Sequence, residues 1–198
     1  MTPTAESLHV RFNPAYDQIP PVRIKGFDRV KFAKLLAELG LNKGAEVGVA
    51  QGLNSLTLCQ NIPEIDLLGI DPWAVYHGNP RAHPKDEQAR CHALAQERLA
   101  PYRVRLVQAF SMDAARDVKD KSLDFVYIDG NHCFDYVMED LIVWSRKVRS
   151  GGIVAGHDYY RFKWSGVVDA VDAYTRAHQI NEWFIDDQRE TSFFWANP

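Results

Sequence analysis

The stretch AEVGVAQGLNS, residues 45–55, has the pattern of a buried strand that turns into a helix. Apolar residues fill the strand, and Gly52 breaks the run before a helical segment begins. Glu46 lies inside the apolar run, two residues before Gly48. Because glycine has no Cβ atom, the backbone at such a turn can approach a ligand closely. The stretch therefore predicts a ligand site at the end of a buried strand.

Short apolar runs alternate with helical patterns along the rest of the chain. The expected strands cover residues 44–50, 66–71, 104–110, 123–129 and 151–158. The expected helices begin at Asp28, follow Gly52, cover about 84–99, 112–119 and 134–148, and follow Ser165. Two further strands, 182–186 and 191–197, have no helix between them and predict a C-terminal antiparallel hairpin. The pattern favours a doubly wound α/β fold with a mostly parallel sheet.

Length and composition narrow the classes of protein. The 198 residues predict one domain, 27–198, preceded by an N-terminal extended arm, 1–26, which carries four prolines. A net charge of −3 gives no reason to expect nucleic acid or an anionic membrane as a partner. No apolar run approaches the roughly 20 residues that cross a bilayer. Three scattered cysteines and the absence of a visible secretory signal favour a cytoplasmic protein.

A second carboxylate follows the next predicted strand. Asp71 lies in LLGIDPW, 25 residues after Glu46. An acid at this place can accept hydrogen bonds from both hydroxyls of a ribose. The turn reads E-x-G-x-x-x-G and lacks the G-x-G-x-x-G pattern of dinucleotide sites, so a ligand with a cationic part suits it better than a pyrophosphate. S-adenosylmethionine has a ribose, an ammonium group and no phosphate.

These motifs together resemble class I S-adenosylmethionine-dependent methyltransferases. AEVGVAQGLNS is similar to their motif I, and GIDPW is similar to the acidic loop after their second strand. The segment 124–159 is similar to a small-molecule branch in which D-G-x-H leads, after one helix, to G-G-x-x-x-x-H-D, as in macrolide-sugar and catechol O-methyltransferases. The resemblance covers about residues 27–196. It implies a seven-stranded Rossmann-like sheet and methyl transfer to a small-molecule acceptor, with a hydroxyl oxygen as the expected target.

The resemblance also implies roles for individual residues. Glu46 is expected to organise the motif I loop and the amino end of the cofactor, and Asp71 to hold the ribose. Ser111 and Met112 are expected against the adenine. A packed loop anchor is an equally good reading of Trp73. The expected cofactor-binding residues are Glu46, Gly48, Gly52, Asn54, Ser55, Asp71, Trp73, Ser111, Met112 and Asp129.

A polar cluster is expected at the ends of the last two parallel strands. IDGNH places Asp129 and His132 after one strand, and GHDYY places His157 and Asp158 after the next. A divalent cation such as Mg or Mn is one expectation, with Asp129, His157 and Asp158 as ligands. Related catechol and sugar methyltransferases often have an acid where this chain has His157. The alternative is a metal-free site in which His132 is the general base, oriented by Asp129 or Asp158.

The remaining polar and aromatic residues have plainer expected roles. The acids of the helix over 134–148 and three histidines are expected on the surface: Asp135, Glu139, Asp140, His77, His83 and His92. The arm, the loop 72–83 and the segment 159–164 are expected to cover the acceptor site. They contribute aromatic side chains that equally suit self-association as a homodimer: Trp73, Tyr76, Tyr159, Tyr160, Phe162 and Trp164.

Two other functions are compatible with the same residues. The first is a metal-dependent hydrolase or lyase that uses the acid and histidine cluster on the same scaffold, because a fold does not fix a function. The second is a non-catalytic module that keeps the cofactor as a structural ligand. Binding of S-adenosylhomocysteine separates a methyltransferase from the hydrolase, and turnover of an acceptor separates it from the module.

Overall fold

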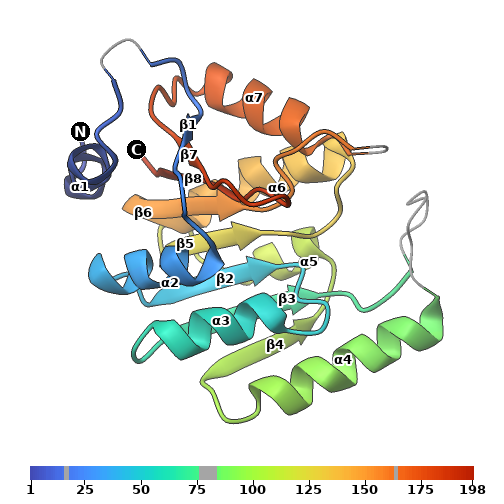
Figure 1. Ribbon diagram of the computed structural model, residues 1–198. Helices are drawn as coiled ribbons and strands as arrows, with labels where there is room; N and C mark the ends of the chain where they lie inside the picture. Colours follow the sequence, from blue (N-terminus) through green and yellow to red (C-terminus); the bar gives the residue numbers. More distant parts are fainter. Residues whose placement is uncertain (16–17, 76–83, 163–164) are drawn as a thin grey trace.

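The computed structural model describes residues 1–15, 18–75, 84–162 and 165–198. Within these residues, eight strands form one sheet in the order β1-β7-β8-β6-β5-β2-β3-β4, and helices cover both of its faces (Figure 1). The strands are β1 (Val22–Arg23), β2 (Lys43–Val47), β3 (Asp66–Asp71), β4 (Val104–Gln108), β5 (Leu123–Ile128), β6 (Val148–Gly156), β7 (Phe184–Ile185) and β8 (Phe193–Ala196). This is the doubly wound α/β architecture that the alternating pattern predicts.

The C-terminal part of the sheet contains the antiparallel strand. β8 runs antiparallel to both β6 and β7, which confirms the predicted hairpin. The described sheet has eight strands, one more than the seven expected, because β1 pairs in parallel with β7. The N–H of Val22 donates to the carbonyl of Trp183 at 2.9 Å, and the N–H of Ile24 donates to that of Ile185 at 2.8 Å. The added strand satisfies backbone groups that a sheet edge leaves unpaired.

The first residues form a helix, α1 (Pro3–Phe12), so the prediction of an extended arm is wrong there. Pro3 occupies the first helical position, where its missing N–H costs nothing and its fixed φ suits the helix. The Thr2 hydroxyl caps the helix by accepting from the N–H of Ala5. Leu8 is buried against the sheet.

Hydrogen bonds near the start of β6 connect it to the N-terminal helix and to the residue after the C-terminal strand. The Thr4 hydroxyl donates to the carbonyl of Gly151 at 2.6 Å. The N–H of Gly151 in turn donates to the carbonyl of Asn197 at 2.9 Å, just after β8. These bonds fasten both ends of the described chain at the amino end of the central strands (Figure 1).

The other helices lie where the sequence pattern predicts them, with α5 shorter than expected. They are α2 (Arg29–Glu38), α3 (Leu53–Asn61), α4 (Lys85–Leu99), α5 (Ser111–Ala115), α6 (Phe134–Lys147) and α7 (Val167–Ala177). α1, α2 and α3 pack on one face of the sheet, and α5, α6 and α7 pack on the other (Figure 1). Along β5, Phe125 and Tyr127 enter one core, whereas Val126 and Ile128 enter the other. This burial on both faces explains why the strands read as continuous apolar runs.

The carboxyl ends of four central strands lie side by side. Val47 of β2 is level with Ile70 of β3 and with Ile128 of β5, and Ile128 is level with Gly156 of β6. Open α/β sheets bind ligands at this edge. The segments that meet there are 48–52, 72–75, 129–133 and 157–162.

Two more general expectations concern membranes and cysteines. Among the helices of the described residues, none has both the length and the apolar character that crossing a bilayer requires. The thiols of Cys59, Cys91 and Cys133 are all unpaired, as the scattered spacing predicts.

Candidate active site

Asp71 joins the ends of β2 and β3. One oxygen of its carboxylate accepts from the N–H groups of Val49 and Ala50, at 3.0 and 2.9 Å. The other oxygen accepts from the N–H of Trp73 at 2.7 Å. Burial raises the pKa of Asp71, and these three bonds act in the opposite direction. Asp71 therefore organises both loops, while its contact with a ribose stays a prediction.

Glu46 is buried beneath the same loop and joins β2 to α3. Its carboxylate accepts from Asn54 Nδ2 at 3.0 Å and from the hydroxyl of Ser55. Burial raises the pKa of Glu46 to about 7, against the lowering effect of the bonds from Ser55 and Asn54. These contacts agree with the expectation that Glu46 organises the motif I loop. In this structure the side chains of Asn54 and Ser55 point to Glu46, and their expected role in binding the cofactor stays a prediction.

The backbone conformation and the packing of the motif I turn require glycine at positions 48 and 52. Gly48 has φ +92°, and a Cβ atom there would lie 2.0 Å from the carbonyl oxygen of Asp129. Gly52 has φ +75°, and a Cβ atom there would lie 3.0 Å from a methyl group of Leu99. The sequence suggested close approach of a ligand, and the protein atoms that approach in this structure belong to the loop after β5 and to α4.

Trp73 anchors the loop that follows β3. Its side chain is buried, and its indole N–H donates to the carbonyl of Ala50 at 2.8 Å. The ring stacks on His92 of α4 with centroids 4.0 Å apart. These contacts favour the anchor role, and they place His92 against Trp73, where the sequence suggested a surface position. His77 and His83 lie outside the described residues.

A cavity of about 330 Å³ opens at the ends of β2, β4 and β5. Ser111 and Met112 line it, and their expected contact with an adenine stays a prediction. The Ser111 hydroxyl donates to the carboxylate of Asp140 and accepts from the indole N–H of Trp144, the latter at 2.8 Å. The full lining is Val47, Val75, Phe110, Ser111, Met112, Gly130, Asn131, Tyr136, Glu139 and Asp140.

Asp140 corrects one sequence expectation. It is 4% exposed and lines the cavity, whereas the sequence placed it on the solvated face of its helix. Asp140 shares the inner face of α6 with the buried residues Val137, Leu141 and Trp144. That helical spacing was visible in the sequence and is the signal that identifies it. Burial raises the pKa of Asp140 to about 7, against the lowering effect of the Ser111 hydroxyl.

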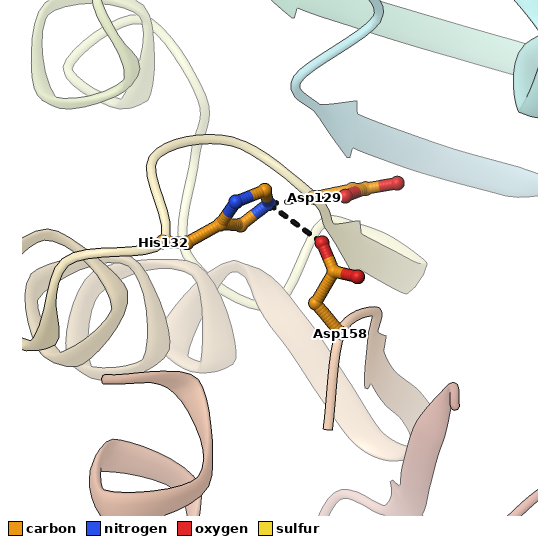
Figure 2. Close-up of side chains that lie close together, drawn as sticks. All are labelled: Asp129, His132 and Asp158. Carbon is orange, nitrogen blue, oxygen red and sulfur yellow. Dashed lines mark ion pairs between the residues drawn. The ribbon is translucent and has the colours of Figure 1, made fainter. Parts of the chain in front are cut away.

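Asp129, His132 and Asp158 come together, as Figure 2 shows. Gly130 and Asn131 of the same segment line the cavity. The Nε2 atom of His132 lies 2.8 Å from Asp158 Oδ2 and 3.7 Å from Asp129 Oδ1. Burial acts to lower the pKa of His132, but the two carboxylates outweigh it and raise the pKa to about 9. The same pairing holds the pKa of Asp158 below its usual range, although burial opposes this.

The three residues present a ligand set for a cation. One atom from each side chain lies within 4.8 Å of the others, and the set consists of two carboxylate oxygens and one imidazole nitrogen. His132 Nε2 is buried, and no described acceptor has hydrogen-bond geometry toward it, although Asp158 is close. A nitrogen and two oxygens this close to one another are donor types that suit a divalent metal ion.

His157 does not belong to this ligand set, which corrects the expected metal ligands. It is 5% exposed, and its Nε2 lies 2.7 Å from Arg29 Nη2. Its Nδ1 lies 3.4 Å from Asp158 Oδ1 and 3.8 Å from Asp129 Oδ2. His132, which the sequence suggested as a base, belongs to the candidate group, and metal binding by either histidine stays a prediction.

Arg29 is a site residue that sequence reasoning missed. It is the first residue of α2, where Asp28 forms the N-cap by accepting from the N–H of Lys31 at 2.8 Å. Its side chain reaches over the ends of the strands to His157, and Nη2 lies 3.9 Å from Asp129 Oδ2. The sequence contains no motif for this contact, because it depends on how α2 packs on the sheet.

The family of the chain follows from comparison with known proteins. Residues 45–159, more than half of the chain, match the family model of a methyltransferase domain. The chain belongs to this family. The matched residues include every residue that lines the cavity and the three side chains of the cluster.

Solved structures resemble this methyltransferase domain in fold. An O-methyltransferase from Bacillus cereus, solved in complex with SAH, is 12% identical, with a TM-score of 0.62 over 98% of this chain and 90% of that chain. The O-methyltransferase NovP is 18% identical, with a TM-score of 0.61 over 85% of this chain and 79% of that chain.

Curated relatives match part of the chain. An uncharacterised protein of Acanthamoeba polyphaga mimivirus is 24% identical over 124 residues, 61% of this chain and 52% of that protein. An uncharacterised protein of Sinorhizobium fredii is 26% identical over 117 residues, 57% of this chain and 12% of that protein. The chain therefore matches about half the length of the first relative and a small part of the second.

Aromatic residues of this methyltransferase domain follow β6 near the cluster. Phe162 lies edge-on to His132 at 6.0 Å and stacks with Tyr160 at 4.6 Å between ring centroids. Tyr159 instead faces the core, since its hydroxyl donates to Asp172 at 2.7 Å and its ring packs on Trp183. Tyr76, Trp164 and residues 76–83 of the expected cover lie outside the described residues.

Proposed function

We propose that this methyltransferase domain moves the methyl group of S-adenosylmethionine to a hydroxyl oxygen of a small-molecule acceptor. One observation carries the proposal: a single segment, residues 129–132, contributes to two adjacent sites. Gly130 and Asn131 line the cavity, whereas Asp129 and His132 belong to the cluster. A cofactor in the cavity and an acceptor at the cluster would lie next to each other, as direct transfer of a methyl group requires.

The cavity has the character expected for the adenosine part of the cofactor. Its lining combines apolar side chains, among them Val47, Val75 and Met112, with a small number of polar groups. Small-molecule sites are commonly concave and mostly apolar, with a few polar groups that fix orientation. Asp71 at the end of the neighbouring strand β3 is the candidate partner of the ribose.

The cluster offers two ways to remove the proton of the acceptor hydroxyl. A divalent cation held by Asp129, His132 and Asp158 would lower the pKa of a hydroxyl bound to it. Without a cation, His132 would accept the proton in its neutral form, which is populated as pH approaches its pKa of about 9, and Asp158 would orient the ring. We favour the cation, because two carboxylate oxygens and one imidazole nitrogen lie within 4.8 Å of one another.

Calorimetric titration with S-adenosylhomocysteine tests the cofactor site. Chelator-treated protein is expected to bind it with micromolar affinity. Gly130→Val is the matched variant: a Cβ atom at Gly130 would have 3.6 Å to the nearest heavy atom, so the chain tolerates it, yet the side chain would fill the cavity. We expect this variant to fold and to lose binding. Absence of binding by the unmodified protein would overturn the proposal in favour of the hydrolase alternative.

Transfer of a labelled methyl group to a panel of catechols and sugars tests the chemistry. Activity that is lost with a chelator, restored by Mn²⁺ and abolished in Asp129→Asn would support the cation. Activity that persists with a chelator and disappears in His132→Gln would instead assign His132 as the general base. Cofactor binding without turnover of any acceptor would favour the non-catalytic module.

A further inference from the structure

Asp140 presents an unusual carboxylate to the cavity. It is 4% exposed, and the hydroxyl of Ser111 is the side chain that donates to it. Among the described residues, no cation stabilises its charge: burial, Ser111 and the like charge of Glu139 are the influences on it. A buried carboxylate with so little compensation is costly unless a ligand supplies another donor.

Asn131 also lines the cavity, and its side chain carries a donor that is unpaired within the described part of the chain. It is 6% exposed, and its Oδ1 accepts from the N–H of Cys133 at 2.9 Å. That bond fixes the orientation of the amide, so Nδ2 is the end left for a ligand. Nδ2 is buried without any hydrogen-bond partner among the described residues. Unpaired buried donors are rare in folded proteins and require a physical explanation.

Two other polar side chains near the cavity, Ser111 and Asp113, are already engaged. The Ser111 hydroxyl donates to Asp140 and accepts from Trp144, so its proton is not available to a ligand. Asp113 of α5 pairs with Arg116 at 3.2 Å, and both side chains are more than half exposed. The cavity therefore offers one buried acceptor, Asp140, and one buried donor, Asn131.

We infer that Asp140 and Asn131 recognise the amino-substituted edge of the purine of the cofactor. The Asp140 carboxylate accepts from the exocyclic N6–H, and Asn131 Nδ2 donates to a ring nitrogen. An adenine presents this donor and acceptor pair, whereas a hypoxanthine presents the reverse, with an O6 acceptor and an N1–H donor. Apolar walls such as Val47 and Met112 suit the faces of a flat ring. The inference rests on the proposed function and names the residues that select its cofactor.

The test compares S-adenosylhomocysteine with S-inosylhomocysteine by calorimetry. The unmodified protein is expected to bind the adenosine compound at least about 100-fold more tightly, because a site built for a donor leaves its groups unpaired with the analogue. In Asp140→Asn the preference is expected to fall below about 10-fold, because an amide can face either edge. Asp135→Asn is the matched control: Asp135 is an exposed acid on the same helix that does not line the cavity, so this variant should keep the full preference.

The outcomes separate the inference from the proposed function. Failure of the unmodified protein to bind S-adenosylhomocysteine would overturn both. Equal binding of the two compounds would overturn the inference but not the proposed cofactor site. An unchanged preference in a folded Asp140→Asn variant would have the same meaning. A purine analogue that lacks the amino group, tested on the unmodified protein, gives the same comparison without any variant and should bind at least about 10-fold more weakly.

Discussion

Arg29 Nη2 lies 2.7 Å from His157 Nε2, and this contact defines the tautomer of His157. A guanidinium group can only donate hydrogen bonds, so Nε2 must be the acceptor and the proton must be on Nδ1. That proton faces Asp158 Oδ1 at 3.4 Å and Asp129 Oδ2 at 3.8 Å. His157 and Arg29 thus lie next to the cluster, and they position the carboxylates of Asp129 and Asp158.

Replacing Arg29 is expected to strengthen cation binding at the cluster. Arg29→Met removes a positive charge 3.9 Å from Asp129 Oδ2, and this charge repels any cation held by that carboxylate. We expect the affinity for Mn²⁺, measured by electron paramagnetic resonance, to rise by about 3-fold to 10-fold. Arg103→Met is the control, since Arg103 pairs with Asp66 at the other end of the sheet. An equal rise in both variants would contradict the assignment.

The two histidines of the site are expected to differ in the same assay. His132→Gln removes a proposed ligand and should weaken Mn²⁺ binding at least about 10-fold, as does loss of a metal-binding contact in general. His157→Gln keeps an acceptor for Arg29 and should change the affinity by less than about 3-fold. A larger loss of Mn²⁺ affinity in His157→Gln than in His132→Gln would instead support the ligands expected from the sequence, Asp129, His157 and Asp158.

Two glycines with positive φ are expected to respond differently to alanine. Gly48→Ala introduces a Cβ atom 2.0 Å from a backbone oxygen, and Gly40→Ala introduces one with no heavy atom within 4 Å. Both carry the strain of a left-handed backbone, about 1 kcal/mol. We expect Gly48→Ala to cost more than about 3 kcal/mol in the free energy of unfolding, measured in urea. Similar costs for the two would mean that β5 moves away easily.

Glu46 is expected to make stability depend on pH. The pKa of Glu46 rises from 4.5 to about 7 on folding. The stabilising contribution of its protonation to the free energy of unfolding is therefore complete below pH 4.5 and is lost as pH rises through 7. At about 1.4 kcal/mol per pKa unit, the loss is on the order of 3 kcal/mol. Glu46→Gln should flatten the unfolding free energy between pH 5 and about pH 8.

The control for this prediction is a glutamate in an open environment. Glu97 lies on α4 and is exposed, so Glu97→Gln should keep the pH profile of the unmodified protein. Burial of Asp140, Asp71 and Asp186 raises their pKa values too, so a slope of the same sign should persist in Glu46→Gln at a reduced size. An unchanged slope in Glu46→Gln would contradict the assignment.

Much of the fold was predictable because its signals are local. Buried parallel strands read as apolar runs, and the amphipathic helices α6 and α7 read as spaced apolar residues. β1 was not predictable in this way, since two residues are too few to show a pattern and their pairing depends on β7. The helix α1 did have a signal in Thr2 and Pro3, which the three later prolines of the arm obscured.

The candidate site was predictable in its carboxylates and less so in its geometry. Asp71 ends a strand, Asp129 and Asp158 follow strands, and strand order brings such residues to one edge. The exchange of His157 for His132 depends on Arg29, whose long side chain crosses from another helix. Tertiary contacts of this kind leave no pattern in a single sequence.

The bonds at Gly151 determine where this domain can be joined to other polypeptides. Thr4 and Asn197 both bind Gly151 near the start of β6, whereas Asp158 lies beyond its far end. A tag, a linker or a neighbouring domain attached at either terminus would therefore leave from the base of the sheet. Tethering the protein to a solid support through either end would leave the mouth of the cavity open to small molecules.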